Sequence, residues 1–448
     1  MAHGWVSRMK VWIPLMGFCL SGFAAPFPTG ELVPSVVCAE NKEFSYALYL
    51  PRAYPAAKAW PVLFCFDPGG RAEMALSLFT GAAEQRGYLV VVPRESRNGL
   101  PDARYSQIGE AVFQDVSRRF KIDARRCYLA GMSGGSRVAL AQALEHPKRF
   151  AGVVSEGAFF DGSRRSAPDS LCYFLVSGDS DFNHWEMQEA RQHLIQGRRT
   201  FWQEEFPGGH RWAPQEFCAQ ALEFLDLAAR RGRLMPPDSA ADAAFSQKQY
   251  EAALGLETSG SRLFAMRKYE DIARVFPEQP AGPQAQKRAR ELRVDPELKV
   301  ELVLEKDYDE LGQKLEKERF KETYWPRLRG VADTATKGSA PASRWAKALV
   351  SVECEALRNA ASACLRGQDW DRAAFLYQAL SALEKESNWN PWCGARAQAR
   401  LGRKNEALAF LKLALERGFR DLSALQSEPD LASLRETPEF QALLEQLK

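Results

Sequence analysis

The chain of 448 residues lacks the features that would place it in several common classes of protein. Its net charge is only +3, so the composition indicates no nucleic-acid partner. It has 5 histidines and 9 cysteines, and neither a Cys-x-x-Cys motif nor a cluster of histidine, cysteine and acidic residues is present. We therefore predict no metal and no cofactor. Beyond the N-terminus, no apolar run is long enough to span a membrane.

The N-terminus has the pattern of an export signal. Residues 1–25 combine two basic residues, an apolar run over 11–20 and a tail of small residues. This order predicts a cleaved signal peptide, and the mature protein is then expected in the periplasm or outside the cell, without a membrane span. Lipid anchoring at Cys19 is disfavoured because the bulky Phe18 precedes it.

The cysteines outside the leader form no recognisable disulfide framework. Eight remain when Cys19 is set aside, and their spacing along the chain is irregular. Cys65, Cys127 and Cys172 lie within or beside apolar, strand-like segments, so we expect them to be buried free thiols even in an exported protein.

The most informative segment is centred on Ser133. Residues 126–132 read as an apolar strand that runs into a Gly-x-Ser-x-Gly motif, and residues 137–144 continue as a helix. A strand, a sharp turn at serine and a helix are the order that a nucleophile elbow requires. Gly131 and Gly135 allow strand and helix to approach closely, so we predict that Ser133 is a catalytic nucleophile.

Acidic residues follow two downstream strands. The apolar run 171–176 is typical of a strand buried on both faces of a parallel sheet, and it ends before Asp179 and Asp181. Carboxylates at this edge of a sheet are well placed to orient a histidine. Asp181 is the predicted acid. Two alternatives remain open, Asp179, which also suits a turn or a helix cap, and Glu156, which ends the preceding strand.

With so few histidines, the choice of a general base is narrow. His210 follows the strand-like segment 200–206 and two glycines, which suit a tight loop that carries a functional side chain. We predict that His210 takes the proton of Ser133 and later returns it to the leaving group. His184 opens a helix after the acidic loop and is predicted to lie on the substrate side.

An oxyanion hole completes the predicted site. One N–H is expected from Gly134, the residue after the nucleophile, and a second from the loop after the apolar run 60–66, around Gly69 and Gly70. Arg71 in this loop and Arg97 in another loop are candidates to meet an anionic part of the substrate, although such arginines are more often solvated. The short spacing after Glu156 leaves no room for a large lid.

These motifs resemble those of the α/β-hydrolases over residues 30–232. The chain is similar to the bacterial branch that includes feruloyl esterases, polyhydroxybutyrate depolymerases and phospholipase/carboxylesterase-like enzymes. Segment 45–51 resembles the second strand of that branch, and the acidic loop resembles its Gly-x-x-Asp pattern. The resemblance implies a doubly wound, mostly parallel sheet and a triad of Ser133, Asp181 and His210.

One departure from that family concerns the oxyanion loop. Many relatives carry His-Gly there, whereas this chain has Asp67-Pro68-Gly69-Gly70. The geometry of the oxyanion hole and the acyl pocket is therefore left open, while the predicted triad is unaffected.

The C-terminal half has a different pattern. A linker over 233–240 precedes a region, 241–448, that is rich in helix-forming residues and lacks strand-like alternation. Segments 367–373 and 402–407 resemble the middle of a tetratricopeptide repeat, where glycine ends one helix and alanine packs in the next. Weaker echoes lie at 267–272 and 306–311, and the apolar tail over 430–447 resembles a terminal cap. A generic helical bundle is the alternative.

Together these features predict an exported serine esterase that cleaves a small-molecule or polymer-linked carboxylic ester through an acyl-enzyme. The helical repeats would bind a protein partner, or would pack on the mouth of the hydrolase and narrow its substrate range. A serine peptidase on the same fold and a scaffold without catalysis are the alternatives. Peptidases of this fold usually carry a large gating domain before the core, for which this chain has no room.

Overall fold

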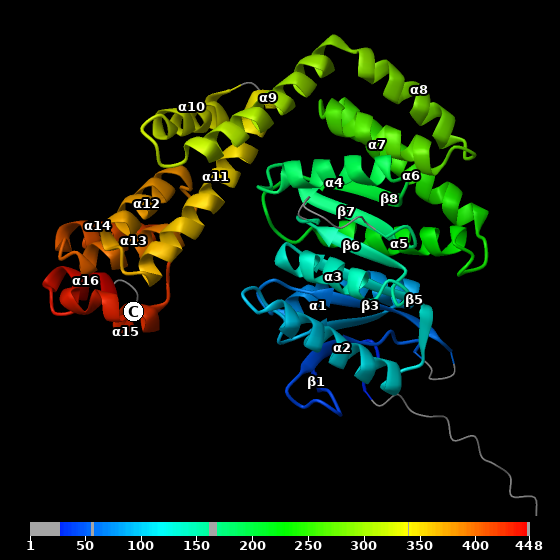
Figure 1. The fold of residues 1–448 in the computed structure, drawn as a ribbon, viewed down its shortest axis with the longest axis horizontal. Helices are drawn as coiled ribbons and strands as arrows, with labels where there is room; N and C mark the ends of the chain where they lie inside the picture. The colour runs from blue at the N-terminus through cyan, green and yellow to red at the C-terminus, as the bar shows by residue number, and fades with distance from the viewer. Residues whose placement is uncertain (1–26, 55–57, 161–167, 339, 446–448) are drawn as a thin grey trace, which may run out of the picture.

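A computed structural model describes residues 27–54, 58–160, 168–338 and 340–445. The predicted signal peptide and Cys19 lie outside these residues. The first part of the chain forms an eight-stranded sheet in the order β1-β2-β4-β3-β5-β6-β7-β8 (Figure 1). Strands β1 and β2 are antiparallel to their neighbours and the other strands run parallel. The strands are β1 (Leu32–Val37), β2 (Ser45–Tyr49), β3 (Trp60–Phe66), β4 (Leu89–Pro93), β5 (Ile122–Met132), β6 (Gly152–Glu156), β7 (Cys172–Gly178) and β8 (Thr200–Phe206).

Helices cover both faces of this sheet, which confirms the predicted doubly wound α/β fold. Helices α1 (Ala72–Arg86) and α5 (Gln215–Arg231) share one apolar core with one face of the strands. Helices α2 (Asp102–Arg119), α3 (Gly134–Glu145) and α4 (His184–Gln196) share a second core with the opposite face. We call this part of the molecule the α/β unit.

The strands form where apolar side chains follow one another without a break. All residues of β3, β4, β6 and β7 are buried, as a parallel sheet covered on both faces requires. Strand β5 begins at Ile122, earlier than predicted, because Ile122 still pairs with Trp60 although the residues after it are exposed. Helix α3 likewise begins directly after Ser133, rather than at residue 137.

The second part of the chain, which we call the helical region, contains only helices in the described residues. They are α6 (Ser239–Thr258), α7 (Arg262–Val275), α8 (Ala281–Val294), α9 (Pro296–Glu318), α10 (Tyr324–Lys337), α11 (Ala340–Arg366), α12 (Trp370–Leu383), α13 (Trp389–Arg400), α14 (Lys404–Glu416), α15 (Leu422–Ser427), the 3-10 helix η1 (Pro429–Leu434) and α16 (Pro438–Glu445). From α10 to α14, each helix packs against the next.

The predicted repeat segments differ in where they fall. Residues 367–373 span the turn between α11 and α12, and residues 402–407 span the turn between α13 and α14. The equivalent apolar positions of the two segments are buried, namely Ala373, Tyr377, Leu380, Ala407, Leu411 and Ala414. The weaker echoes at 267–272 and 306–311 lie inside α7 and α9 instead of at turns. Assignment to tetratricopeptide repeats remains a prediction.

The helical region is joined to the α/β unit by a buried junction at the open edge of the sheet. The apolar core that includes Trp202 of β8 continues to Phe245 of α6 and to Phe276, the residue after α7. Charged pairs are buried beside it. Arg191 of α4 donates to Asp271 of α7 at 2.7 Å. Helix α7 therefore covers strand β8, whose outer edge would otherwise be unpaired.

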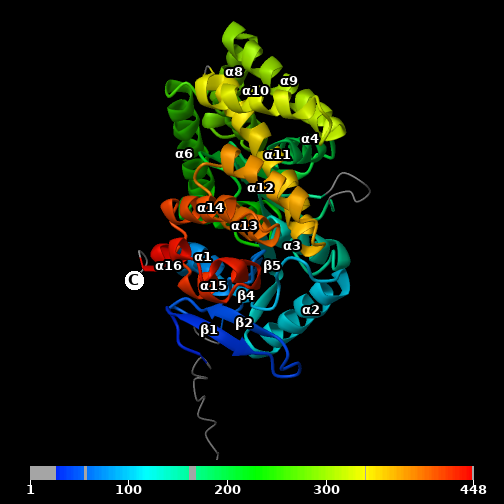
Figure 2. The ribbon, with the colours of Figure 1, turned by 90° about the vertical axis from the view of Figure 1, so that its left-hand side faces the viewer.

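Beyond this junction the helical region turns back over the α/β unit. In Figure 2, helices α11 to α13 lie in front of α3 and β5, at the edge of the sheet where β5 ends. The parallel strands β3 to β8 all end at this edge, so the loops that carry the predicted catalytic residues face α11.

All eight cysteines of the described residues are free, and seven of them are buried. Burial raises the pKa of the thiols of Cys38, Cys127 and Cys172 to about 12. The prediction of buried free thiols at Cys65, Cys127 and Cys172 is confirmed. No helix within the described residues is long and apolar enough to cross a membrane.

Candidate active site

Ser133 lies on a sharp turn between β5 and α3. Its φ of 54° is unusual for a residue with a side chain, and such strain is typical of an elbow that presents a nucleophile. The flanking glycines are required by space. A Cβ on Gly131 would overlap the carbonyl group of Gly135, and a Cβ on Gly135 would overlap the carbonyl oxygen of Phe66. The turn therefore needs glycine on both sides, as the motif predicted.

The structure brings Ser133, His210 and Asp181 together in a line. His210 Nε2 is 2.7 Å from Ser133 Oγ, and His210 Nδ1 is 2.8 Å from Asp181 Oδ1. Asp181 follows β7 and His210 follows β8, so neighbouring parallel strands deliver the two side chains to one edge. Asp181 is fully buried, and its Oδ1 also accepts the N–H of Asn183 at 2.7 Å. This arrangement allows a proton to pass from the hydroxyl to an imidazole that the carboxylate orients.

Two neighbours hold the imidazole in place. The ring of Phe182 packs against that of His210 at a tilt of 34°, with centroids 3.9 Å apart. Gly157 lies behind the His210–Asp181 pair with a φ of 58°, and a Cβ there would be only 3.0 Å from Asp181 Oδ2. Glycine at this position therefore lets the pair approach the backbone closely.

The two alternative acids have other contacts. Asp179 Oδ1 accepts the N–H of Gly208 at 3.0 Å, and so it fixes the loop that leads to His210. Glu156 Oε2 accepts the N–H of Ala213 at 2.9 Å, on the far side of the same loop. Neither acid bonds to the histidine, so the geometry favours Asp181 among the three.

Glu156 is buried without a cation beside it. Burial raises the pKa of its carboxyl to about 8, while hydrogen bonds from Ala213 and Cys218 oppose the shift. A raised pKa keeps the proton on this group at neutral pH. Glu156 is thus an uncharged support beneath the histidine loop.

The loop after β3 is organised by Asp67. This carboxylate accepts the N–H groups of Gly69 at 2.8 Å and Arg71 at 2.9 Å, and the indole N–H of Trp212 at 2.7 Å. Burial raises the pKa of Asp67, but these bonds and the guanidinium of Arg71 outweigh burial and lower it. The bond to Trp212 ties this loop to the histidine loop. The amides of Gly69 and Gly70 both donate within the loop, which contradicts their prediction as oxyanion donors.

The cleft above Ser133 is walled by both parts of the molecule. Its volume is about 490 Å³. The α/β unit contributes Pro68, Arg71, Asn98, Met132, Ser133, Phe182 and His210. The helical region contributes Ser351, Glu355 and Arg358, which lie on one face of α11, and Glu384. The Arg358 guanidinium bonds to both glutamates. We call these four residues the α11 wall.

The structure places the three predicted substrate-side residues differently with respect to the cleft. Arg71 lines the cleft, although its guanidinium is held by Asp67 at 2.9 Å. Arg97 is exposed and is not among the residues that line the cleft. The prediction for His184 is wrong. Its side chain is fully buried in the junction, where Nε2 is 3.1 Å from Glu305 of α9.

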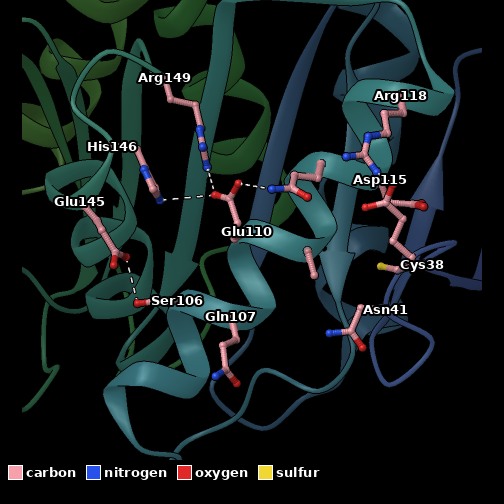
Figure 3. A pocket seen from close by; sticks show the side chains of 13 residues that line it. Cys38, Asn41, Ser106, Gln107, Glu110, Asp115, Arg118, Glu145, His146 and Arg149 are labelled. Atoms are coloured by element: carbon pink, nitrogen blue, oxygen red, sulfur yellow. Dashed lines mark hydrogen bonds and ion pairs between the residues drawn. The ribbon is translucent and has the colours of Figure 1, made fainter.

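Another hollow, of about 700 Å³, lies away from the triad along α2. Figure 3 shows that Glu110 of this hollow contacts both Arg149 and His146, and that Glu145 contacts Ser106. None of the three aligned residues lines it. In the described residues no group of three or more potential ligands gathers to hold a metal ion.

The order of the strands and the helices on both faces of the sheet define an α/β-hydrolase fold. Residues 39–231 match the model of an esterase family, described as "Putative esterase". This match covers most of the α/β unit and somewhat less than half of the chain. With this match, the protein is a carboxylic ester hydrolase of the α/β-hydrolase fold. No curated protein matches the chain.

Several solved structures are similar to this chain. A ferulic acid esterase is 16% identical over 45% of this chain and 98% of its own, with a TM-score of 0.36. The feruloyl esterase module from Clostridium thermocellum is 13% identical over 44% and 87%, also with a TM-score of 0.36. An S-formylglutathione hydrolase from Agrobacterium tumefaciens is 16% identical over 45% and 94%, with a TM-score of 0.35.

Sequence reasoning missed two parts of the site. The α11 wall lies more than 200 residues after Ser133 and carries no motif, so only the folded chain brings it to the cleft. The role of Asp67 could have been predicted from the sequence, because an acid before Pro-Gly-Gly is placed to accept hydrogen bonds from the amides of the turn that follows.

Proposed function

We propose that Ser133, His210 and Asp181 act as a catalytic triad. The observation that carries this proposal is the line of two hydrogen bonds from Ser133 Oγ through the imidazole to the buried carboxylate, at 2.7 and 2.8 Å. Ser133 Oγ attacks the ester carbonyl while His210 Nε2 takes the hydroxyl proton. Asp181 fixes the imidazole orientation and stabilises the imidazolium.

The reaction then proceeds in two halves. His210 returns the proton to the alcohol as the first tetrahedral intermediate collapses, and the acyl group remains on Ser133 Oγ as an ester. A water molecule that loses its proton to His210 attacks this acyl-enzyme, and the acid is released with the serine restored. The Gly134 N–H at the start of α3 supplies one oxyanion donor, aided by the positive end of the helix.

We also propose that the helical region contacts the substrate through the α11 wall. Ser351, Glu355 and Arg358 share the cleft with Ser133, so an ester larger than a simple acyl group would meet them. For location we propose export to the periplasm or the medium, on the basis of the leader pattern of residues 1–25. The mass of the protein recovered from a periplasmic extract tests this, because cleavage after Ala24 or Ala25 removes a defined segment.

The triad proposal is tested with a p-nitrophenyl ester of a short acid. We expect turnover by the parent and a loss of about 10⁴-fold or more in Ser133→Ala. A fluorophosphonate should label the parent and leave the variant unlabelled. Equal turnover by both proteins would overturn the proposal. Labelling without ester turnover would instead indicate a peptidase or a highly selective esterase.

A further inference from the structure

The geometry of the cleft leaves one oxyanion donor to be found. Acyl transfer through a tetrahedral intermediate is strongly assisted when two N–H groups meet the developing oxyanion. Gly134 offers one at the N-terminus of α3. In this fold the second N–H usually comes from the loop after β3, which here is residues 67–71.

The N–H groups of residues 69–71 in that loop already donate hydrogen bonds within the loop. Gly69 N–H and Arg71 N–H both donate to Asp67 Oδ2, and Gly70 N–H donates to the Asp67 carbonyl oxygen at 3.2 Å. Pro68 has no N–H. The Arg71 guanidinium is drawn back by two bonds to the same carboxylate, at 3.1 Å and 2.9 Å.

Asn98 lines the same cleft, next to the β3 loop. It belongs to the loop after β4, and its backbone N–H donates to the carbonyl oxygen of Pro68 at 2.8 Å, which fixes it against the β3 loop. Asn98 and Ser133 line the same hollow. Among the described residues, its carboxamide makes no hydrogen bond, so its two N–H groups are available.

The carboxamide of Asn98 takes the space that a side chain at position 134 would fill. An ideal Cβ on Gly134 would overlap Asn98 Oδ1 and would be 3.1 Å from Asn98 Nδ2. The carboxamide is therefore beside the residue whose N–H is the first oxyanion donor. Rotation about its last side-chain bond is soft, so Nδ2 can turn toward an oxyanion at little cost.

We propose that the carboxamide of Asn98 is the second oxyanion donor of this enzyme, acting with the N–H of Gly134. The inference rests on the proposed triad, because the oxyanion forms only when Ser133 attacks. The same geometry explains why position 134 is glycine, since a larger residue would displace the donor. Asp67 keeps the β3 loop rigid and leaves donation to the neighbouring loop.

The test compares Asn98→Ala and the nearly isosteric Asn98→Asp with the parent on the same p-nitrophenyl ester. A donor that acts in the transition state lowers kcat more than it changes KM, so we expect kcat to fall about 100-fold with KM within about threefold. Asn405→Ala, at an exposed position on α14, is the matched control and should match the parent. Circular dichroism and melting temperature verify folding.

A second pair of variants separates donation from a merely structural role. Gly134→Ala should lower kcat by displacing the carboxamide, and it should cost much less when introduced into Asn98→Ala. Unchanged kcat in folded Asn98→Ala and Asn98→Asp would overturn the role of Asn98 while Ser133→Ala remained inactive. Turnover that survives Ser133→Ala would overturn the triad and this inference together.

Discussion

The helical region meets the α/β unit in two places that differ in chemistry. At the junction, Arg191 and Asp271 are buried and bonded at 2.7 Å, and Trp345 packs on His184 with ring centroids 4.9 Å apart. At the cleft, the α11 wall stands opposite Ser133 across an open hollow, and its charged side chains are about 30% exposed. The junction contact is buried, and the cleft contact is open to solvent.

The junction holds the helical region on the α/β unit, whereas the α11 wall is placed to affect which substrate binds. A buried charge that loses its partner is costly, so the junction tolerates little change. Charges in an open cleft are screened by water, so substitutions there cost little stability. The helical region can therefore vary the wall that faces the substrate while its position on the α/β unit stays fixed.

The largest effect is expected from Asp271→Ala at the junction. The change leaves the buried guanidinium of Arg191 with only the more distant carboxylate of Glu270, at 3.6 Å, and breaking a buried pair costs about 3–5 kcal/mol. Denaturant unfolding measures the loss. Asp333→Ala on α10 is the matched control, because its carboxylate is exposed and paired only with Lys337. A loss of less than about 1 kcal/mol in Asp271→Ala would contradict the distinction between the two contacts.

A second prediction compares the pH response of two buried carboxyls. Asp271 is buried, which raises its pKa, but the charges of Arg191 and Arg274 outweigh burial and lower it. Its stabilisation is present above the unfolded pKa of about 4 and is lost as pH falls. Glu156 has no cation, and burial raises its pKa to about 8. Its stabilisation is complete below the unfolded pKa and is lost as pH rises through about 8.

Glu156→Gln tests the second half of that comparison. Glutamine keeps an acceptor for the N–H of Ala213 and cannot ionise. We expect the parent to lose stability between about pH 4.5 and pH 8, and the variant to lose less over the same range. Chemical denaturation at several pH values gives both curves. Parallel curves for the two proteins would show that Glu156 does not titrate in this range.

The smallest effect is expected at the α11 wall. Arg358→Ala frees the carboxylates of Glu355 and Glu384, which then repel an anionic ester. We expect KM for a hemisuccinate ester to rise about two- to fivefold relative to a neutral ester of similar size, since partly exposed charges contribute little. Turnover of p-nitrophenyl acetate should be nearly unchanged. An equal effect on all three esters would mean that the wall does not contact substrate.

The sequence predicted the parts of the fold that depend on local pattern. The buried strands appear as apolar runs, and the elbow at Ser133 appears as glycines at fixed spacing before a helix. The order of Asp181 and His210 along the chain placed both at the edge where parallel strands end. Each of these inferences rests on neighbouring residues and on the handedness of strand connections.

Contacts that depend on long-range packing were not predictable in this way. His184 has the position of a substrate-side residue in the sequence, but α9 and α11 fold over it and bury it. The sequence predicted that the amides of Gly69 and Gly70 point to the substrate, but in the structure both donate to Asp67 within the same turn. In the first case distant helices bury the side chain, and in the second the acceptors that Asp67 provides occupy the two amides; neither contact is visible in the local sequence pattern.

The buried thiols can report how often the sheet opens by local unfolding. Thiolate is the reactive form of cysteine, and burial holds the pKa of Cys127 and Cys172 at about 12. An alkylating reagent therefore reacts with these strand residues only when the sheet opens. The rate at which these thiols are modified would measure how often the α/β unit opens. The rate at Cys364, which is partly exposed on α11, would give the corresponding value for the helical region.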